Sequence, residues 1–424
     1  MSVSPTLAPL ALSIDGARLW ATLMELARIG ATEKGGVCRL TLTDLDRQAR
    51  DRFVRWAREL DCELRVDRIG NIFARRPGTD PARRAVATGS HLDTQPTGGR
   101  FDGNYGVLAG LEVLRTLKQA DIRTRAPLEV CVWTNEEGSR FVPVMMGSGV
   151  YAGAFPLELA LSATDREGHS VASALEAIGY AGSAPAAVAD GAPAFDAYFE
   201  AHIEQGPILE AQDVVIGAVT GALGQRWYDL TVIGQEAHAG PTPMNLRRDA
   251  LLVASRLVCK VNEIARGEAP HGRGTVGCLT VHPDSRNVIP GRVTLSVDFR
   301  HPDDAGLLRM DAALRAAAQA ECTADGGIEV GVEQVVYFPP AAFDPVLLDS
   351  IRTGAREIGI EPLDIVSGAG HDAVYAARIA PTAMIFIPCK DGISHNEIED
   401  ALPEHVTAGA NVLLHAMLAR AGRA

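Results

Sequence analysis

The sequence has no CxxC pair, no apolar run long enough to cross a bilayer and no excess of basic residues. Seven cysteines, scattered and odd in number, are typical of a reducing compartment rather than of a disulfide framework. The formal net charge of -13 repels phosphate backbones and anionic lipid, and no local basic patch offsets it. We therefore expect a cytoplasmic protein that binds neither nucleic acid nor a membrane.

What the sequence does have is length and an ordinary globular composition. Its 424 residues exceed what one compact domain usually holds. Hydrophobic residues make up 47% and charged residues 22%, which excludes disordered, collagen-like and coiled-coil classes. A two-domain enzyme is the expectation that these numbers favour.

The first pattern along the chain alternates apolar strands with a helix. It predicts a strand that begins near residue 85, a helix over 103–119 and a second strand from residue 127. Apolar strands separated by helices indicate a mixed, largely parallel α/β sheet flanked by helices, with functional groups at the carboxyl ends of its strands. A strand at 381–388 and a helix at 401–421 return to this pattern near the end of the chain.

The second pattern fills the region between. It predicts a strand at 226–234, a helix at 244–265, strands at 275–282 and 293–299, a helix at 305–321 and a strand at 327–335. This order is that of an α+β ferredoxin-like unit. We therefore expect a catalytic domain made of residues 1–218 and 335–424, interrupted by an inserted domain at 219–334.

Polar side chains follow the first predicted strand in the segment GSHLDTQPTGGRFDGNYG. His91 and Asp102 offer one imidazole and one carboxylate to a metal, and Asp93 is placed to accept the second ring N–H of His91. Taken alone, a polar loop with aspartate turn residues explains this segment equally well.

The next predicted strand ends in Glu136 and Glu137. Adjacent carboxylates point in different directions, so one can bind a metal while the other takes a proton from water, although such a pair more often lies in a solvated loop. His202 and His395 follow two further apolar runs. Three histidines and two carboxylates suit zinc, or manganese or cobalt, and the lack of cysteine argues against a purely structural zinc site.

Taken in order, several segments resemble the dinuclear metallopeptidase superfamily of aminoacylases, carboxypeptidase-like enzymes and dipeptidases, and more closely its hydantoinase/carbamoylase branch. They are GSHLDTQPTGGRFDGNYG, TNEEGSRF, AHIEQGP, GQEAHAGPTPM, RNVIPG, SGAGHDA and SHNE, which together span most of the chain. The resemblance implies two divalent metal ions bridged by Asp102, one held also by His91 and His202 and the other by Glu137 and His395. It makes Glu136 the general base.

The resemblance also gives the inserted domain the role of a lid and dimerisation domain. His238 would reach the active site of a neighbouring subunit in a homodimer and stabilise the developing oxyanion. Gln205, Asn287 and Arg300 correspond to substrate-holding positions, and the planar fork of Arg300 suits a substrate carboxylate. His371 receives no defined role: it could stabilise its loop, or its turn could help to hold an anion.

The reaction that the resemblance implies is hydrolysis of an N-carbamoyl-L-amino acid to the amino acid, ammonia and carbon dioxide. Allantoate amidohydrolase and β-ureidopropionase are alternatives with the same chemistry, since one methylene changes discrimination by only about 1 to 3 kcal/mol. A non-catalytic protein that uses metal only to stabilise its fold is an alternative of another class. Glu136 argues against it, because a structural site has no use for a free carboxylate beside its ligands.

Overall fold

The computed structural model describes residues 12–324 and 327–424. The chain forms two compact units: the first runs to Thr220 and resumes at Ala342, and the second is Gly221–Ala341. The expected boundary after residue 334 falls inside the strand β13 (Glu329–Phe338), because β13 stays paired with β7 as far as Phe338. Within the described residues, none of the helices combines the length and the apolar character needed to cross a bilayer.

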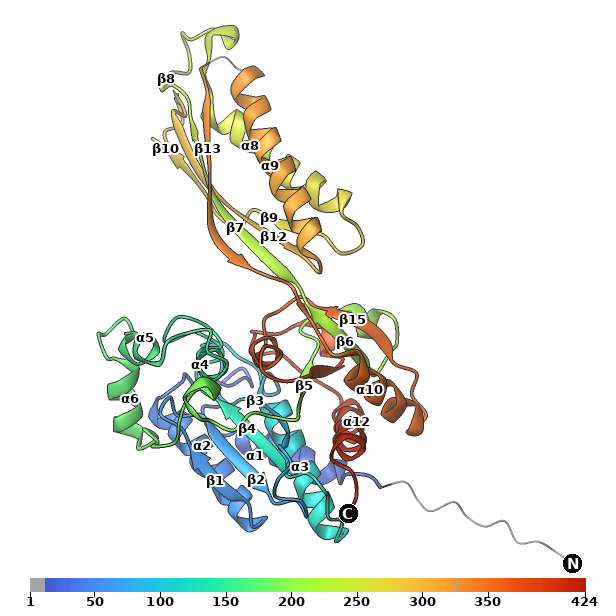
Figure 1. The fold of residues 1–424 in the computed structure, drawn as a ribbon. Helices are drawn as coiled ribbons and strands as arrows, with labels where there is room; N and C mark the ends of the chain where they lie inside the picture. The colour runs from blue at the N-terminus through green and yellow to red at the C-terminus, as the bar shows by residue number, and fades with distance from the viewer. Residues whose placement is uncertain (1–11, 325–326) are drawn as a thin grey trace, which may run out of the picture. The chain divides into compact units, whose positions relative to one another are not determined.

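The first unit is built on a nine-stranded mixed sheet (Figure 1). Strands β4, β3, β5 and β16 form its parallel centre, and antiparallel strands lie on either side. In the order of the sheet, the strands are β1 (Glu63–Val66), β2 (Ile72–Arg76), β4 (Leu128–Trp133), β3 (Val86–His91), β5 (Ala197–Ile203), β16 (Thr382–Ile387), β6 (Gly217–Ala222) and β14 (Ala341–Ala342), with β15 (Leu363–Ser367) paired to β6.

Every residue of the four central strands is buried, which explains why each reads as a continuous apolar run. Helices flank this sheet, and α3 and α12 pack on β3, β5 and β16. The helices of this unit are α1 (Gly16–Leu26), α2 (Asp44–Glu59), α3 (Asn104–Gln119), α4 (Met146–Tyr151), α5 (Leu157–Ser162), α6 (Val171–Ile178), α7 (Ile208–Ala211), α10 (Pro345–Glu357), α11 (Asp372–Ala376) and α12 (Pro403–Ala421). The mixed, largely parallel α/β architecture expected from the sequence is confirmed.

The second unit is an antiparallel sheet with α8 and α9 along one face (Figure 1). Residues of β12 alternate between buried and half-buried, as expected of a sheet that is covered on one side. Its elements are β7 (Gly224–Ile233), β8 (Ala237–His238), α8 (Ala250–Gly267), β9 (Arg273–Thr275), β10 (Leu279–His282), β11 (Val288–Ile289), β12 (Arg292–His301), α9 (Asp304–Ala324) and β13.

Two local expectations for this unit need correction. The helix expected over 244–265 begins at Ala250, because the Asp249 side chain accepts hydrogen bonds from Leu251 and Leu252 and caps it there. The single strand expected over 275–282 is two strands, β9 and β10, which pair with different parts of β12.

Candidate active site

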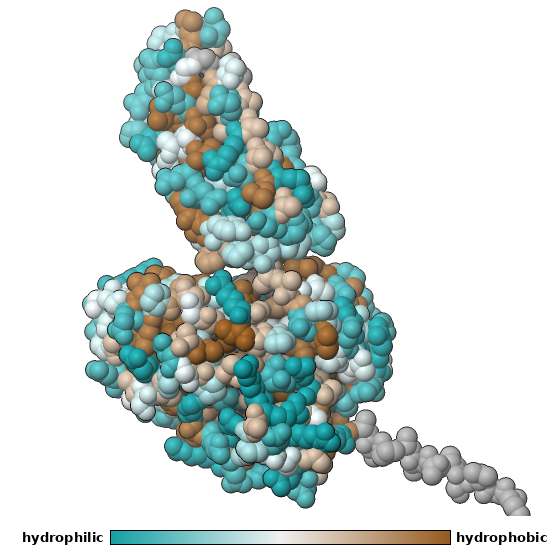
Figure 2. All heavy atoms as spheres, viewed as in Figure 1, coloured by the Kyte–Doolittle hydropathy of each residue, from teal (hydrophilic) through white to brown (hydrophobic). Residues whose placement is uncertain are grey.

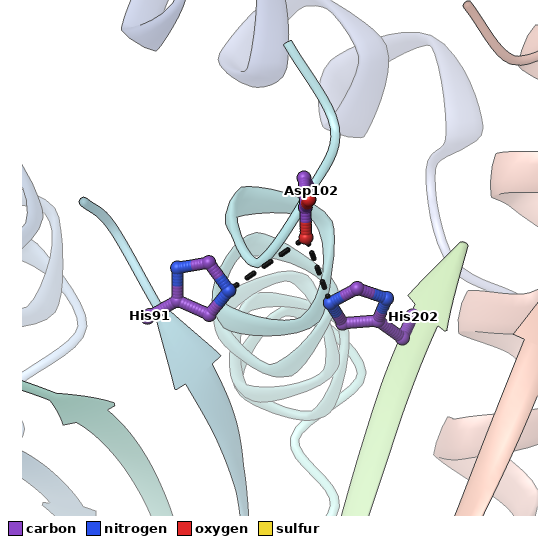
Figure 3. Close-up of side chains that lie close together, drawn as sticks. All are labelled: His91, Asp102 and His202. Atoms are coloured by element: carbon purple, nitrogen blue, oxygen red, sulfur yellow. Dashed lines mark ion pairs between the residues drawn. The ribbon is translucent and has the colours of Figure 1, made fainter. Parts of the chain in front are cut away.

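Asp102 lies at the centre of a cluster of histidines at the carboxyl ends of the central strands. Its Oδ1 is 3.1 Å from Nε2 of His202 and 3.7 Å from Nε2 of His91 (Figure 3). Its Oδ2 faces the other way and is 3.3 Å from Nε2 of His395. The two oxygens of one carboxylate therefore serve two different groups of nitrogen ligands.

The sheet explains how distant residues meet here. His91 ends β3 and His202 lies near the end of β5, and the two strands are parallel neighbours, so their carboxyl ends share one edge. Asp102 enters from the turn before α3, where Gly103 has a φ of +64° and passes close to the His91 ring. An added Cβ at Gly103 would stand only 2.4 Å from that ring.

A second group shares Asp102. Oε2 of Glu137, just after β4, is 3.4 Å from Nε2 of His395, which lies in the loop after β16. His91, Asp102 and His202 form one set of closely spaced potential ligand atoms, and Asp102, Glu137 and His395 form another. Imidazole nitrogens and carboxylate oxygens at this spacing fit divalent cations such as zinc, manganese or cobalt. The residues present therefore fit a pair of cations.

The orientation of two histidine rings supports the same fit. Nδ1 of His91 is 2.9 Å from the carbonyl oxygen of Asp93, and Nδ1 of His202 is 2.8 Å from that of Ile203. A carbonyl can only accept, so Nδ1 of each ring carries a hydrogen and Nε2 faces Asp102. Nε2 of each ring is therefore available as a metal ligand, and that of His202 also accepts a hydrogen bond from the Gly103 N–H at 3.3 Å.

This geometry corrects the role expected of Asp93. Its carboxylate is 3.8 Å from Nδ1 of His91, too far for a hydrogen bond, and its backbone carbonyl takes that place. The Asp93 carboxylate instead lies 3.4 Å and 3.3 Å from the backbone N–H groups of Glu136 and Glu137. It therefore contacts the turn that carries both glutamates.

The charges of the cluster depend strongly on one another. Burial opposes ionisation of Asp102, but the neighbouring rings of His202, His395 and His91 hold its pKa well below the usual range. The hydrogen bond to Asp102 raises the pKa of His395 to about 9, against the effect of burial. Burial and then the negative charge of Asp102 raise the pKa of Glu137 to about 7. An acidic site of this kind attracts cations.

Glu136 differs from its neighbour because it belongs to neither set of potential ligands. Its Oε2 is 3.6 Å from Nε2 of His91. Burial raises its pKa well above the usual range, opposed by His91 and reinforced by Asp372 and Glu137. A buried carboxylate with a raised pKa and no fixed ligand role is suited to taking up and giving back a proton.

Glu399 is a buried residue beside the cluster that the sequence did not single out. Its Oε1 accepts the backbone N–H groups of Phe101 at 3.0 Å and Asp102 at 3.1 Å, and its Oε2 accepts the Ser394 hydroxyl at 2.8 Å. Burial, followed by the charge of Asp102, raises its pKa to about 7. No local pattern singles it out, because Phe101 and Asp102 lie almost three hundred positions earlier in the chain.

His371 has a defined place behind the cluster. Its ring meets that of His202 edge to face at 4.5 Å, and its Nε2 is 2.9 Å from the Ser367 hydroxyl. Burial and then His202 hold its pKa well below the usual range, so the ring is neutral. His371 therefore supports the ring of His202 by packing, and Glu200 contributes beside it by accepting the N–H of Ala373.

Gln205 lies in the cluster itself. Its Nε2 donates to Oδ2 of Asp102 at 2.8 Å and lies 3.4 Å from Nε2 of His395. The residue proposed from the sequence to hold substrate thus sits against the central carboxylate.

The second unit carries the other three residues that the sequence singled out. It brings His238 and Asn287 together and places Arg300 apart from both. His238 is in β8 opposite Val288 of β11, and the carbonyl of Asn287 accepts the N–H of Ala239 at 2.9 Å. Arg300 is aligned with Gln225 at the far end of β12 and is paired with Asp298 at 2.8 Å. The strand from Arg292 to Arg300 alone spans about 26 Å. One small substrate therefore cannot touch both Asn287 and Arg300 of the same second unit.

Comparison with known proteins identifies the family of the chain. The family model for Peptidase family M20/M25/M40 matches residues 87–419 of the sequence. The chain belongs to this family.

Relatives place this family member in the hydantoinase/carbamoylase branch. It is 47% identical over 405 residues to the N-carbamoyl-L-amino-acid amidohydrolase of Rhizobium meliloti, a match that covers 96% of each chain. The solved structure of a hydantoinase/carbamoylase family amidase from Burkholderia multivorans is 59% identical, with a TM-score of 0.94 over 97% of this chain and 99% of that one. The ureidoglycolate hydrolase of Arabidopsis thaliana is 35% identical over 95% of this chain and 86% of its own. This M20 chain is thus an enzyme that hydrolyses amide bonds.

Proposed function

We propose that the enzyme hydrolyses the ureido C–N bond of an N-carbamoyl-L-amino acid. One water is consumed, and the free amino acid, ammonia and carbon dioxide are released. The observation that carries the proposal is Asp102, whose two oxygens face two separate ligand groups, with Glu136 held beside them as a free carboxylate. The name of the Rhizobium meliloti relative supports the substrate class.

We propose that His91, Asp102 and His202 hold one divalent cation and that Asp102, Glu137 and His395 hold a second. Zinc is the proposed ion, with manganese or cobalt as alternatives, because the ligands are imidazoles and carboxylates. When bound, such ions act as Lewis acids and make hydroxide available near neutral pH. Glu399 contributes by holding the backbone of the turn that carries Asp102.

Glu136 is the proposed general base. It would take the proton of the attacking water and deliver it to the leaving nitrogen of the ureido group. Its burial and its place outside both ligand groups support this role. Replacing Glu136 by Gln keeps size and burial but removes the proton acceptor, so turnover should fall about 100- to 10,000-fold. Zinc content, measured by mass spectrometry, should remain two per chain, and full turnover in this variant would refute the role of Glu136.

The separation within the second unit supports a homodimer in which two subunits contribute to each active site. Arg300 would clamp the substrate carboxylate, with Gln205 contributing from the ligand cluster. His238, beside Asn287, would reach the active site of the other subunit and donate to the developing oxyanion. The active site of a single chain would then lack the histidine that the other subunit supplies.

The surface of the second unit supports pairing with a second copy. Trp227 and Ile233 project from the face of β7 opposite the helices and are 39% and 44% exposed, and β13 lies at an edge of the sheet. Figure 2 shows hydrophobic residues among the hydrophilic ones on this unit. An exposed strand edge beside apolar side chains is a template for pairing with another chain.

Mixing two inactive variants tests this arrangement. A dimer of one Glu136→Gln chain and one His238→Ala chain would have one complete site only if His238 acts on the partner, so an equal mixture should regain about a quarter of wild-type activity. If His238 serves its own chain, both sites of the mixed dimer are defective and no activity returns. Subunits must be exchanged by mild denaturation and refolding, with each variant alone as the control.

Ureidoglycolate is the second candidate substrate, favoured by the name of the Arabidopsis thaliana relative. Allantoate and N-carbamoyl-β-alanine stay predictions from the sequence. Ammonia release from zinc-loaded enzyme should be compared across N-carbamoyl-L-amino acids, ureidoglycolate, allantoate and N-carbamoyl-β-alanine. The highest kcat/KM should belong to an N-carbamoyl-L-amino acid, and a higher value for any other compound would overturn the proposed substrate. We also propose the cytoplasm as its location, because all seven cysteines are free thiols.

A further inference from the structure

Arg39 is a fully buried arginine in the segment between α1 and α2. Its Nε donates to the carbonyl of Leu92 at 2.7 Å, and its Nη2 donates to Oδ1 of Asn104 at 2.6 Å. Its Nη1 donates to the carbonyls of Leu26 and Ile29 at 3.2 Å and 2.8 Å. All three nitrogens of the guanidinium thus donate hydrogen bonds, and two of them, Nε and Nη2, reach the loops of the candidate active site.

The two loops are those of His91 and Asp102. Leu92 directly follows His91, and the backbone of Arg39 is also tied to Thr94, whose hydroxyl accepts the Arg39 N–H at 2.8 Å and whose N–H donates to the Arg39 carbonyl at 2.9 Å. Asn104 passes the connection on, because its Nδ2 donates to the Asp102 carbonyl at 3.0 Å. Arg39 therefore joins the backbone on the two sides of the His91–Asp102 pair.

The charge and the donors of Arg39 explain why this buried position holds an arginine. Burial lowers its pKa, but only to about 10, so it is a cation at neutral pH. The acceptors of its side chain named above are carbonyl and amide oxygens, while the carboxylates of Asp46 and Asp93 favour its charge from a distance. A lysine could not supply planar donors to several separate acceptors at once. Arginine therefore supplies the site with several hydrogen-bond donors in one fixed plane.

We infer that Arg39 is a positioning residue that fixes the separation of His91 and Asp102 for the cation that both would hold with His202. The inference rests on the proposed metal sites. It assigns Arg39 no contact with substrate and no proton transfer. Its effect should be larger on the first ligand group, which contains both His91 and Asp102, than on the second, which shares only Asp102 with it.

Arg18 offers a matched comparison. It is also an arginine with several hydrogen bonds across the fold, donating to Glu112 at 3.1 Å and 2.5 Å and to Gln119 at 2.9 Å. Its partners lie along the middle and end of α3, away from Asp102 at its start. A lysine at position 18 or position 39 keeps the positive charge but loses the planar set of hydrogen-bond donors. Only at position 39 do those donors reach the turns that carry His91 and Asp102.

Zinc titration of the chelated full-length chain tests the inference. In Arg39→Lys, one of the two zinc ions should bind about 10- to 100-fold more weakly, as is typical when a residue that orients ligands is lost. The other, which shares only Asp102 with the first, should be weakened less. Arg18→Lys should bind both zinc ions like the wild type while its melting temperature falls. Calorimetry gives the affinities and mass spectrometry the stoichiometry.

Three outcomes would overturn the inference. They are wild-type zinc affinity in Arg39→Lys, equal weakening in both lysine variants, and equal weakening of both zinc ions. If Arg39→Lys does not fold, Asn104→Ala decides, because it breaks the same connection at the first residue of α3, where alanine suits the helix. Unchanged zinc affinity in that variant would also overturn the inference. Wild-type protein that does not take up two zinc ions would instead refute the proposed function, and the inference would fall with it.

Discussion

Replacing Gly103 by Ala should disable the active site while leaving the rest of the fold in place. Gly103 has a φ of +64°, and a Cβ there would stand 2.4 Å from atoms of the His91 ring. Carbon atoms in contact normally lie about 3.5 Å apart. The ring must therefore retreat by about 1 Å, and it is 2% exposed with its Nδ1 bound to the Asp93 carbonyl.

The size of the effect follows from that displacement. A misplacement of about 1 Å at a reacting centre can cost about 100-fold in rate, so kcat/KM should fall about 100-fold or more. Zinc affinity should fall too, because His91 is one of the ligands of the first group. The backbone of Gly103, with φ +64° and ψ -49°, lies in a region that residues with a Cβ rarely adopt, which adds about 1 to 3 kcal/mol of destabilisation.

Gly168 provides the matched control. Its φ is +86°, and nothing lies within 4 Å of the position of an added Cβ. Gly168→Ala should therefore lose only the stability that the positive φ costs, and keep its activity and both zinc ions. We would measure melting temperature, zinc content and ammonia release for both variants. The reasoning is refuted if Gly103→Ala keeps wild-type kcat/KM, or if Gly168→Ala loses as much activity.

Two further predictions concern substrate binding and pH. Arg300→Lys should raise KM about 10-fold or more for a carboxylate substrate, because the pair of hydrogen bonds from the guanidinium to the carboxylate is lost. The variant and the wild type should differ much less on the corresponding carboxamide. An equal loss on both compounds would contradict binding of the carboxylate by Arg300. In metal-free enzyme, the folded state raises the pKa of Glu137 and Glu399 from 4.5 to about 7 and of His395 from 6.5 to about 9, so it holds these protons to higher pH than the unfolded chain does. The stability that these groups contribute should therefore be complete below about pH 4.5 and be lost by about pH 9. The melting temperature of chelated protein should fall from pH 5.5 to 8.5 and fall less with zinc present, and a rise over this range would contradict the assigned shifts.

The parts of the site that the sequence could predict are those that end apolar runs. His91, Glu137, His202 and His395 each come at or after a strand of the parallel centre, and a parallel sheet brings such ends to one edge. The order of strands and helices could be predicted for the same reason, since burial on both faces or on one face leaves different patterns.

The parts that could not be predicted depend on contacts between distant positions. Arg39 and Glu399 lie outside any motif, and their importance arises only when the fold brings them to the turns around Asp102. The distance between Asn287 and Arg300 was likewise hidden, because thirteen positions of sequence say nothing about whether the strand between them is straight or folded back. Backbone carbonyls as partners of histidine rings leave no mark on the sequence at all.

The position of β16 between β5 and β6 has a consequence for how the protein is made. On the ribosome, β5 and β6 emerge early, and the strand that must fit between them arrives only after the entire second unit has been synthesised. Until then, an apolar strand of the nascent chain keeps an open edge, a state prone to aggregation. His395 arrives later still, so the proposed second cation site cannot be complete before release of the chain is near. A premature stop after the second unit would thus remove a strand from the middle of the sheet rather than trim its border.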